Sequence, residues 1–142
     1  MLYTSEPQDF SPKFTTVACF LQQNDKFLLL KRHKNKPQGH EWGLPAGKIH
    51  DGELPEETCV REIEEETGIR VKDLELVGKF YQKYPNYDFV LYVFKTALDH
   101  KPSVILNEQE HKDFKWVNPQ ESRTLPLMLD LNEVISKVYE GF

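Results

Sequence analysis

The segment from Gly47 to Ile69 limits the folds open to this chain more than any other part of the sequence. Its centre, Pro55–Glu66, is predicted to be an α-helix, because proline suits the first turn of a helix and Gly68 suits the position just past its end. The apolar residues of this helix fall on one side and are Cys59, Val60 and Ile63. We therefore expect that side to pack against a hydrophobic core.

The same helix carries three carboxylates next to its apolar side. Glu62, Glu65 and Glu66 are spaced i, i+3 and i+4, so they share one helical face. Like charges at this spacing repel by roughly 0.2–0.5 kcal/mol per exposed pair, so a cation should compensate them. Clustered carboxylate oxygens suit hard ions such as Mg²⁺ or Mn²⁺ better than Zn²⁺. The alternative is an acidic helix face that contacts only water.

Strand-like runs on both sides of this helix predict an α/β fold. The expected strands are Lys13–Gln22, Lys26–Arg32, Leu74–Gln82, Tyr87–Thr96 and Phe114–Val117. Asn24-Asp25 suggests a hairpin, Asn118-Pro119 can begin a short helix, and a C-terminal helix is marked by Leu131, Val134, Ile135 and Val138. Strands interleaved with helices predict a mixed β-sheet between helices.

The length of 142 residues suits one domain. Residues 1–12 contain two prolines among polar residues and are expected to be a flexible N-terminal arm, which leaves residues 13–142 as the single domain.

Charge and hydropathy exclude several classes of partner. The net charge of −5 makes long nucleic acid a poor candidate but leaves room for a small phosphorylated ligand. The longest apolar run, Phe89–Phe94, is far shorter than the roughly 20 residues of a membrane span, and no secretory signal is visible. Only Cys19 and Cys59 are present, so no disulfide framework is implied and a cytoplasmic location is expected.

The Gly47–Ile69 segment resembles the Nudix box at every defined position. In order it reads Gly47, five residues, Glu53, seven residues, Arg61-Glu62-Ile63, one residue, Glu65-Glu66, one residue, Gly68-Ile69. The preceding Trp42–Gly47 stretch also resembles the family. The resemblance implies an α/β/α sandwich with the box as loop, helix and loop. It further implies a hydrolase that uses a divalent metal to cleave a diphosphate linked to another moiety.

The resemblance also implies roles for individual residues. The carboxylates implied to bind the metal are Glu62, Glu65 and Glu66. Glu53 is implied either to pair with Arg61, which would then be an orienting residue, or to join the metal site directly. Ala46, where many members have a second glycine, would contribute its backbone carbonyl to the metal.

Family members often supply one more carboxylate from a loop outside the box. Glu110, six residues before Trp116, resembles that residue, and Glu108 is the competing candidate. Glu62 and Glu110 are both candidates for the general base that accepts a proton from water.

Candidate substrate contacts are less well defined by the sequence. Arg32 ends an expected strand at a point where related enzymes use arginine to contact phosphate, and Lys48 is a weaker candidate. The aromatic residues that offer either a stacking surface or, more commonly, core packing are Tyr81, Tyr84, Tyr87 and Phe89. The five histidines show no metal-binding spacing and are expected in loops, with His40 alone suggesting a cleft wall.

The leading functional hypothesis is a compact MutT-type enzyme that converts a nucleoside triphosphate to monophosphate and pyrophosphate. The alternative substrates are a dinucleoside polyphosphate or a nucleotide sugar, because Tyr84 and Pro85 match markers of both. Leu127–Asp130 lacks the amide that reads oxidised guanine in some MutT-type enzymes. The alternative of another class is a catalytically silent Nudix sensor, and an RNA 5′-end hydrolase has no evident track for a strand. The oligomeric state is left open, a dimer included.

Overall fold

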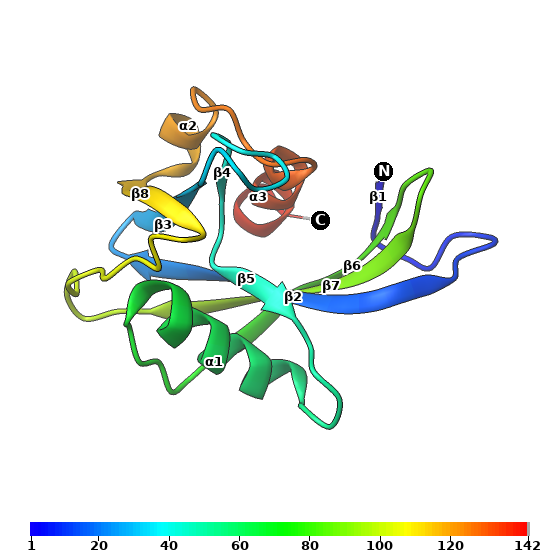
Figure 1. Ribbon diagram of the computed structural model, residues 1–142, viewed down its shortest axis with the longest axis horizontal. Helices are drawn as coiled ribbons and strands as arrows, with labels where there is room; N and C mark the ends of the chain where they lie inside the picture. The colour runs from blue at the N-terminus through cyan, green and yellow to red at the C-terminus, as the bar shows by residue number, and fades with distance from the viewer. Residues whose placement is uncertain (142) are drawn as a thin grey trace.

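A mixed sheet runs through the computed structural model, which describes residues 1–141, and helices cover both of its faces (Figure 1). The elements are β1 (Leu2–Tyr3), β2 (Pro12–Gln23), β3 (Lys26–Arg32), β4 (Trp42–Gly43), β5 (Ala46–Lys48), α1 (Pro55–Thr67), β6 (Glu75–Lys83), β7 (Asp88–Ala97), β8 (His111–Val117), α2 (Pro119–Ser122) and α3 (Leu131–Glu140). The strand order is β1-β6-β7-β2-β3-β4, with β5 on β2 and β8 on β3. The predicted α/β fold with a mixed sheet between helices is confirmed.

The sheet divides where β2 and β3 separate. The two strands form the predicted hairpin but pair only next to its turn, at Gln22 and Gln23. Away from the hairpin turn, β2 pairs in parallel with β7 on one side. On its other side, β2 pairs with β5 over Thr16–Ala18. β3 instead pairs with β8 and β4. The sheet therefore opens into two arms, and β5 lies where they part (Figure 1).

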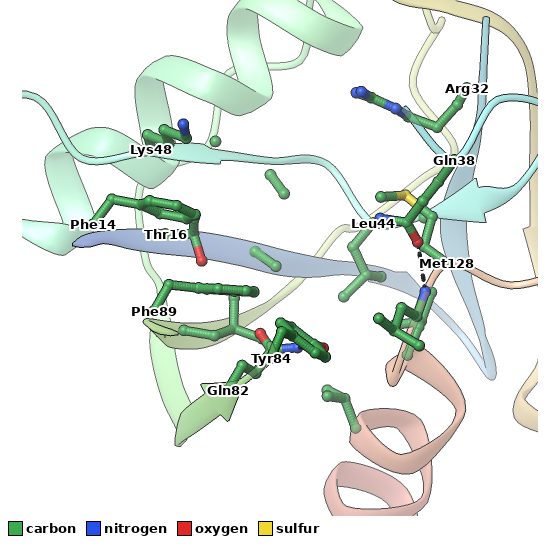
Figure 2. Close-up of a pocket in the computed structure, with 18 of the residues that line it drawn as sticks. Phe14, Thr16, Arg32, Gln38, Leu44, Lys48, Gln82, Tyr84, Phe89 and Met128 are labelled. Carbon is green, nitrogen blue, oxygen red and sulfur yellow. Dashed lines mark hydrogen bonds between the residues drawn. The ribbon is translucent and has the colours of Figure 1, made fainter. Parts of the chain in front are cut away.

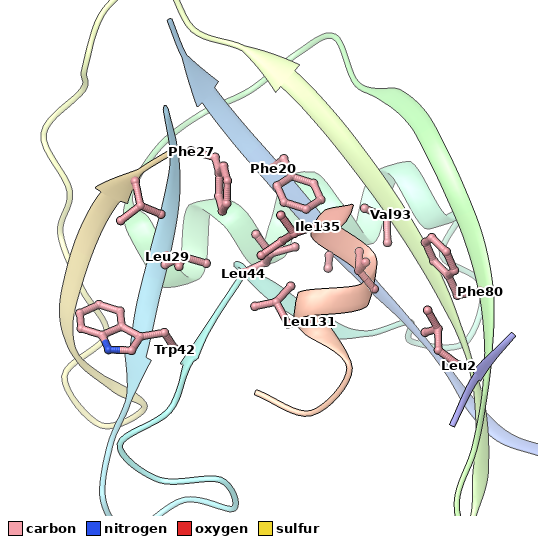
Figure 3. Packing of buried hydrophobic residues seen from close by; sticks show 13 residues of the cluster. Leu2, Phe20, Phe27, Leu29, Trp42, Leu44, Phe80, Val93, Leu131 and Ile135 are labelled. Carbon is pink, nitrogen blue, oxygen red and sulfur yellow. The ribbon is translucent and has the colours of Figure 1, made fainter. Parts of the chain in front are cut away.

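Side chains of β2 contribute alternately to two hydrophobic cores, one on each face of the sheet, because successive side chains of a strand point to opposite faces. Cys19 packs in the cluster that includes Ile63 of α1. Phe20 packs in the cluster that includes Ile135 of α3, as Figure 3 shows. Val93 and Phe94 of β7 divide in the same way between the two clusters, so β7 is covered on both faces as predicted.

Helix α1 has the ends that the sequence predicts, with one further residue at its C-terminus. Its N-terminus is capped by Glu57, whose Oε1 accepts a 2.8 Å hydrogen bond from the backbone N–H of Leu54. Gly68 follows the helix in the left-handed conformation at φ 74°, and its N–H donates to the carbonyl of Glu64. Glycine adopts this conformation without steric cost, so it ends the helix cleanly.

The N-terminal segment is more closely attached than a flexible arm. β1 pairs with β6, and Leu2 is buried at 7% exposure within the core on the α3 side. Near the other end of the segment, the N–H of Ser11 donates to Asp88 at 2.9 Å. The segment is therefore held at both ends. Of the helices that the structure describes, none has the length and apolar character needed to cross a membrane.

Candidate active site

Glu66 is the buried carboxylate around which the site is arranged. It lies in the last full turn of α1, is 4% exposed, and accepts a 2.8 Å hydrogen bond from the N–H of Ala46 in β5. Burial raises the pKa of Glu66 well above its usual range, and the charges of Glu62 and Glu110 raise it further. The side chain is therefore a fixed acceptor that a nearby positive charge would stabilise.

The positive charge of Arg61 offsets the repulsion between the carboxylates of the helix. Its Nε and Nη2 bind the two oxygens of Glu53 at 2.8 and 3.0 Å. Its Nη1 lies 2.8 Å from Glu62 and 3.3 Å from Glu65. The hydrogen bonds from Arg61 are the main cause that lowers the pKa of Glu53 to about 2. Of the two arrangements open for Glu53, the structure shows the pair with Arg61.

Gly47 explains how Glu62 reaches this position. A β-carbon added at Gly47 would lie 2.1 Å from Cδ of Glu62, so any larger residue would displace the carboxylate. The glycine at the start of the box is therefore required by the path of the Glu62 side chain across β5. Burial raises the pKa of Glu62 despite its contact with Arg61.

β8 brings a second acidic segment to the end of α1. Ligand atoms of Glu66, Glu110 and His111 all lie within 4.8 Å of one another. Glu110 immediately precedes β8, which pairs with β3 so that His111 lies opposite Arg32. Glu108, the competing candidate, is exposed and belongs to no such group among the described residues.

His111 is a buried residue of the site that sequence reasoning missed. It was expected in a loop, but β8 begins three residues earlier than predicted and buries His111 at 3% exposure. Burial, with smaller effects of Arg32 and Lys36, lowers the pKa of His111 to about 4. His111 stands in the polar run Glu110–Asp113, which shows no hydrophobic alternation, so nothing in the sequence signals this burial.

His40 occupies a different place from the one expected. It is exposed in the loop between β3 and β4, and its Nδ1 lies 2.7 Å from Nζ of Lys112. It is absent from the lining of the cavity described next, so the expectation that it forms a cleft wall is wrong.

A cavity of about 590 Å³ extends from Glu66 and His111 to an aromatic wall. Figure 2 shows Phe14 and Phe89 on one side of it and Arg32 and Met128 on the other. Glu66, His111 and Arg32 line one end of it. The aromatic residues that line it are Phe14, Tyr84, Tyr87 and Phe89. Three of these were expected more commonly in the core, whereas Tyr81, which packs against Phe10, is absent from the lining.

Ring contacts hold the aromatic wall together. Phe14 stacks on Phe89 with 5.0 Å between ring centroids and 15° between planes, because the two residues are partners in the parallel β2–β7 pairing. Nζ of Lys48 lies 4.3 Å above the ring of Phe14. The hydroxyl of Tyr84 donates to Asp130, just before α3. The candidate residues Arg32, Lys48 and Tyr84 thus all border this one cavity.

This arrangement suits a ligand with one anionic and one planar apolar part. Carboxylate oxygens at the acidic end can hold a divalent cation, and the ligand atoms there are close enough to share one after a small adjustment. Arg32 and Lys48 offer positive charge to an anion, and the aromatic wall offers a stacking surface.

The chain is similar to known proteins in sequence and in fold. A family model described as NUDIX domain matches residues 12–140. The uncharacterized Nudix hydrolase YvcI of Bacillus subtilis (strain 168) is 30% identical over 126 residues, which cover 87% of this chain and 77% of that protein. The ADP-ribose pyrophosphatase of the same organism is 32% identical over 96 residues, 68% of this chain and 50% of that protein. The structure of a MutT protein from Methanosarcina mazei Go1 shares the fold, with a TM-score of 0.81, 23% identity, and coverage of 94% of this chain and 97% of that one.

Proposed function

The chain belongs to the Nudix family of hydrolases that act on nucleotide-linked phosphoanhydrides, and from this premise we propose that it is a metal-dependent pyrophosphohydrolase of nucleoside triphosphates. The products would be a nucleoside monophosphate and pyrophosphate. The observation that carries the proposal is one cavity lined by Glu66 and Arg32 at one end, where Glu110 lies beside Glu66, and by an aromatic wall at the other. A nucleotide has the matching polarity, with phosphates at one end and a planar base at the other.

The cavity favours one nucleoside over two. Its volume of about 590 Å³ lies within the usual range of small-molecule sites, and its aromatic lining residues gather into one wall. A dinucleoside polyphosphate would leave its second base outside this wall. A nucleotide sugar such as ADP-ribose, the substrate named for one relative, remains the second candidate because it also carries a single base.

The residues proposed to hold the metal offer only hard oxygen atoms. They are the side chains of Glu62, Glu65, Glu66 and Glu110 and the backbone carbonyl of Ala46. When bound, a divalent ion such as Mg²⁺ or Mn²⁺ supplies positive charge against the phosphate oxygens. The buried Glu66, whose pKa is raised by the lack of water around it, fits such an ion.

The remaining roles follow from position. Arg61 orients Glu53, Glu62 and Glu65 through its hydrogen bonds and is held away from the substrate by them. Arg32 and Lys48 would bind the outer phosphates. Either Glu110 or Glu62 would accept the proton of the attacking water; Glu62 already shares its carboxylate with Arg61, so the freer Glu110 is our first choice.

A nucleotide panel tests the proposal. Initial rates with Mg²⁺ and with Mn²⁺ are measured for nucleoside triphosphates, ADP-ribose and dinucleoside tetraphosphates, and the products are resolved by chromatography. We expect monophosphate and pyrophosphate from triphosphates, and loss of activity without loss of folding when a chelator removes the metal. Cleavage of nucleotide sugars alone would replace the substrate. Binding of nucleotides without cleavage of any would indicate a silent sensor.

Reaction in water labelled with heavy oxygen locates the cut. We expect the label in pyrophosphate, because phosphates held between the helix carboxylates and Arg32 place the β phosphorus at the acidic end. Label in the monophosphate would mean attack at the α phosphorus and a different position of the substrate in the cavity.

A further inference from the structure

The imidazole of His111 is buried beside the metal-binding carboxylates and has no role in the proposal above. Its side chain is 4% exposed, and its Nδ1 has no hydrogen-bond partner among the described residues. The nearest carboxylate oxygen, Oε2 of Glu66, lies 3.9 Å away, which is too far for a hydrogen bond. Burying a polar atom without a partner costs free energy, so native proteins rarely leave one in this state.

The distances around this nitrogen fit the coordination sphere of one ion. Two ligand atoms on opposite sides of an ion are about 4.2 Å apart when each bond is about 2.1 Å. The 3.9 Å between Nδ1 of His111 and Oε2 of Glu66 lies within that limit. The three ligand atoms of Glu66, Glu110 and His111 are at most 4.8 Å apart, so the widest pair need close by only about 0.6 Å.

The side chains of Glu66 and Glu110, which are grouped with His111, differ in how far they can move. Glu66 is fixed by its hydrogen bond from Ala46. Glu110 is only partly buried at the end of a loop, so its carboxylate has room to close the remaining distance. His111 itself is fixed by the pairing of β8 with β3. An ion at this point would meet two rigid ligands and one adjustable ligand.

We propose that Nδ1 of His111 is a ligand of the divalent metal ion together with Glu66 and Glu110. The inference rests on the proposed function, which places the metal at these carboxylates. An imidazole nitrogen favours first-row transition ions, whereas Mg²⁺ prefers oxygen. His111 therefore raises the affinity of the site for Mn²⁺ and Co²⁺ relative to Mg²⁺.

Pulsed electron paramagnetic resonance of the full chain loaded with Mn²⁺ tests this directly. We expect electron spin-echo modulation from a coordinated ¹⁴N nucleus, replaced by the ¹⁵N pattern when histidine is labelled with ¹⁵N. We expect the modulation to disappear in His111→Asn. Bound Mn²⁺ without nitrogen modulation would overturn the inference, as would modulation that persists in His111→Asn. The isotope comparison needs no substitution, so it holds even if the variant fails to fold.

Calorimetric titration with Mn²⁺ and Mg²⁺ gives a second readout that does not depend on activity. In His111→Asn, we expect the Kd for Mn²⁺ to rise at least about tenfold and that for Mg²⁺ to rise much less. His40→Asn is the matched control, since His40 is exposed at φ 67°, a conformation that asparagine tolerates, and both affinities should be unchanged. Equal losses for both ions would contradict the preference.

These outcomes separate the inference from the proposed function. A protein that binds Mn²⁺ through oxygen alone and hydrolyses nucleotides would refute the role of His111 and leave the proposed function intact. A protein that binds neither ion would refute both.

Discussion

The two ends of the cavity are built in different ways. The acidic end is bordered by one continuous segment, Glu53–Glu66, of which Glu66 lines the cavity, and hydrogen bonds from Arg61 and from the N–H of Ala46 hold the carboxylates of this segment. The aromatic end brings Phe14 of β2 together with Tyr84 and Phe89 of the β6–β7 hairpin, which lies far along the chain, and ring contacts hold it together. The comparison suggests a division of work, with reaction chemistry at the first end and selection of the nucleoside at the second.

The largest effect is expected from Glu66→Gln at the acidic end. The amide keeps an acceptor for the N–H of Ala46 but removes the charge proposed to hold the metal, so kcat should fall by about 10³-fold or more. The melting temperature without metal should be unchanged or higher, because a buried charge is removed. Steady-state rates at saturating Mg²⁺ and thermal melting measure the two effects.

The matched control for that change is Glu64→Gln, two residues earlier on the exposed side of α1, where Glu64 pairs with Arg70. Its rates should stay close to wild type. If Glu66→Gln also kept near-normal rates, the helix would be only an acidic surface and the division between the two ends would fail.

The next largest effect is expected from Glu110→Gln compared with Glu108→Gln. Loss of a general base typically costs about 10²–10⁴-fold in rate, and Glu110 alone of the two lies with Glu66 and His111. The comparison of kcat for both variants checks this. A fall in kcat in Glu108→Gln alone would mean that the loop contributes Glu108 instead of Glu110. If kcat fell in neither variant, Glu62 would be left as the base.

A pair of glycine substitutions separates the acidic end from another part of the cavity lining. Gly47→Ala pushes against Glu62, so kcat should fall about tenfold or more while the melting temperature changes little. Gly43→Ala instead meets Sδ of Met128, which lines the cavity, so KM should change more than kcat. Equal changes of kcat in both variants would argue against the division.

The smallest effect is expected from Phe14→Leu at the aromatic end. Loss of an aromatic stacking partner costs about 1–3 kcal/mol per base, so KM should rise by about fivefold or more with kcat nearly unchanged. Phe10→Leu is the control, because Phe10 packs on Tyr81 and is absent from the cavity lining. A fall in kcat without a change in KM would move Phe14 to the reaction chemistry.

The same comparison explains what the sequence could and could not predict. Spacing within one helix determines which residues share a face, so the grouping of Glu62, Glu65 and Glu66 and the ends of α1 were predictable. The stacking of Phe14 on Phe89 depends on the parallel pairing of β2 with β7, which no local pattern encodes. The burial of His111 likewise depends on the pairing of β8 with β3. Residues grouped by the geometry of one helix could be predicted from the sequence, whereas contacts that depend on strand pairing could not.

Substrate truncation tests most directly whether both ends act on one molecule. The value of kcat/KM is measured for a nucleoside triphosphate and for ribose 5′-triphosphate, which lacks the base, in the wild-type chain and in Phe14→Leu. We predict that the wild-type chain prefers the complete nucleotide at least about tenfold and that Phe14→Leu loses most of this preference. An equal preference in both proteins would contradict the account, because the base would then be bound somewhere other than the aromatic wall.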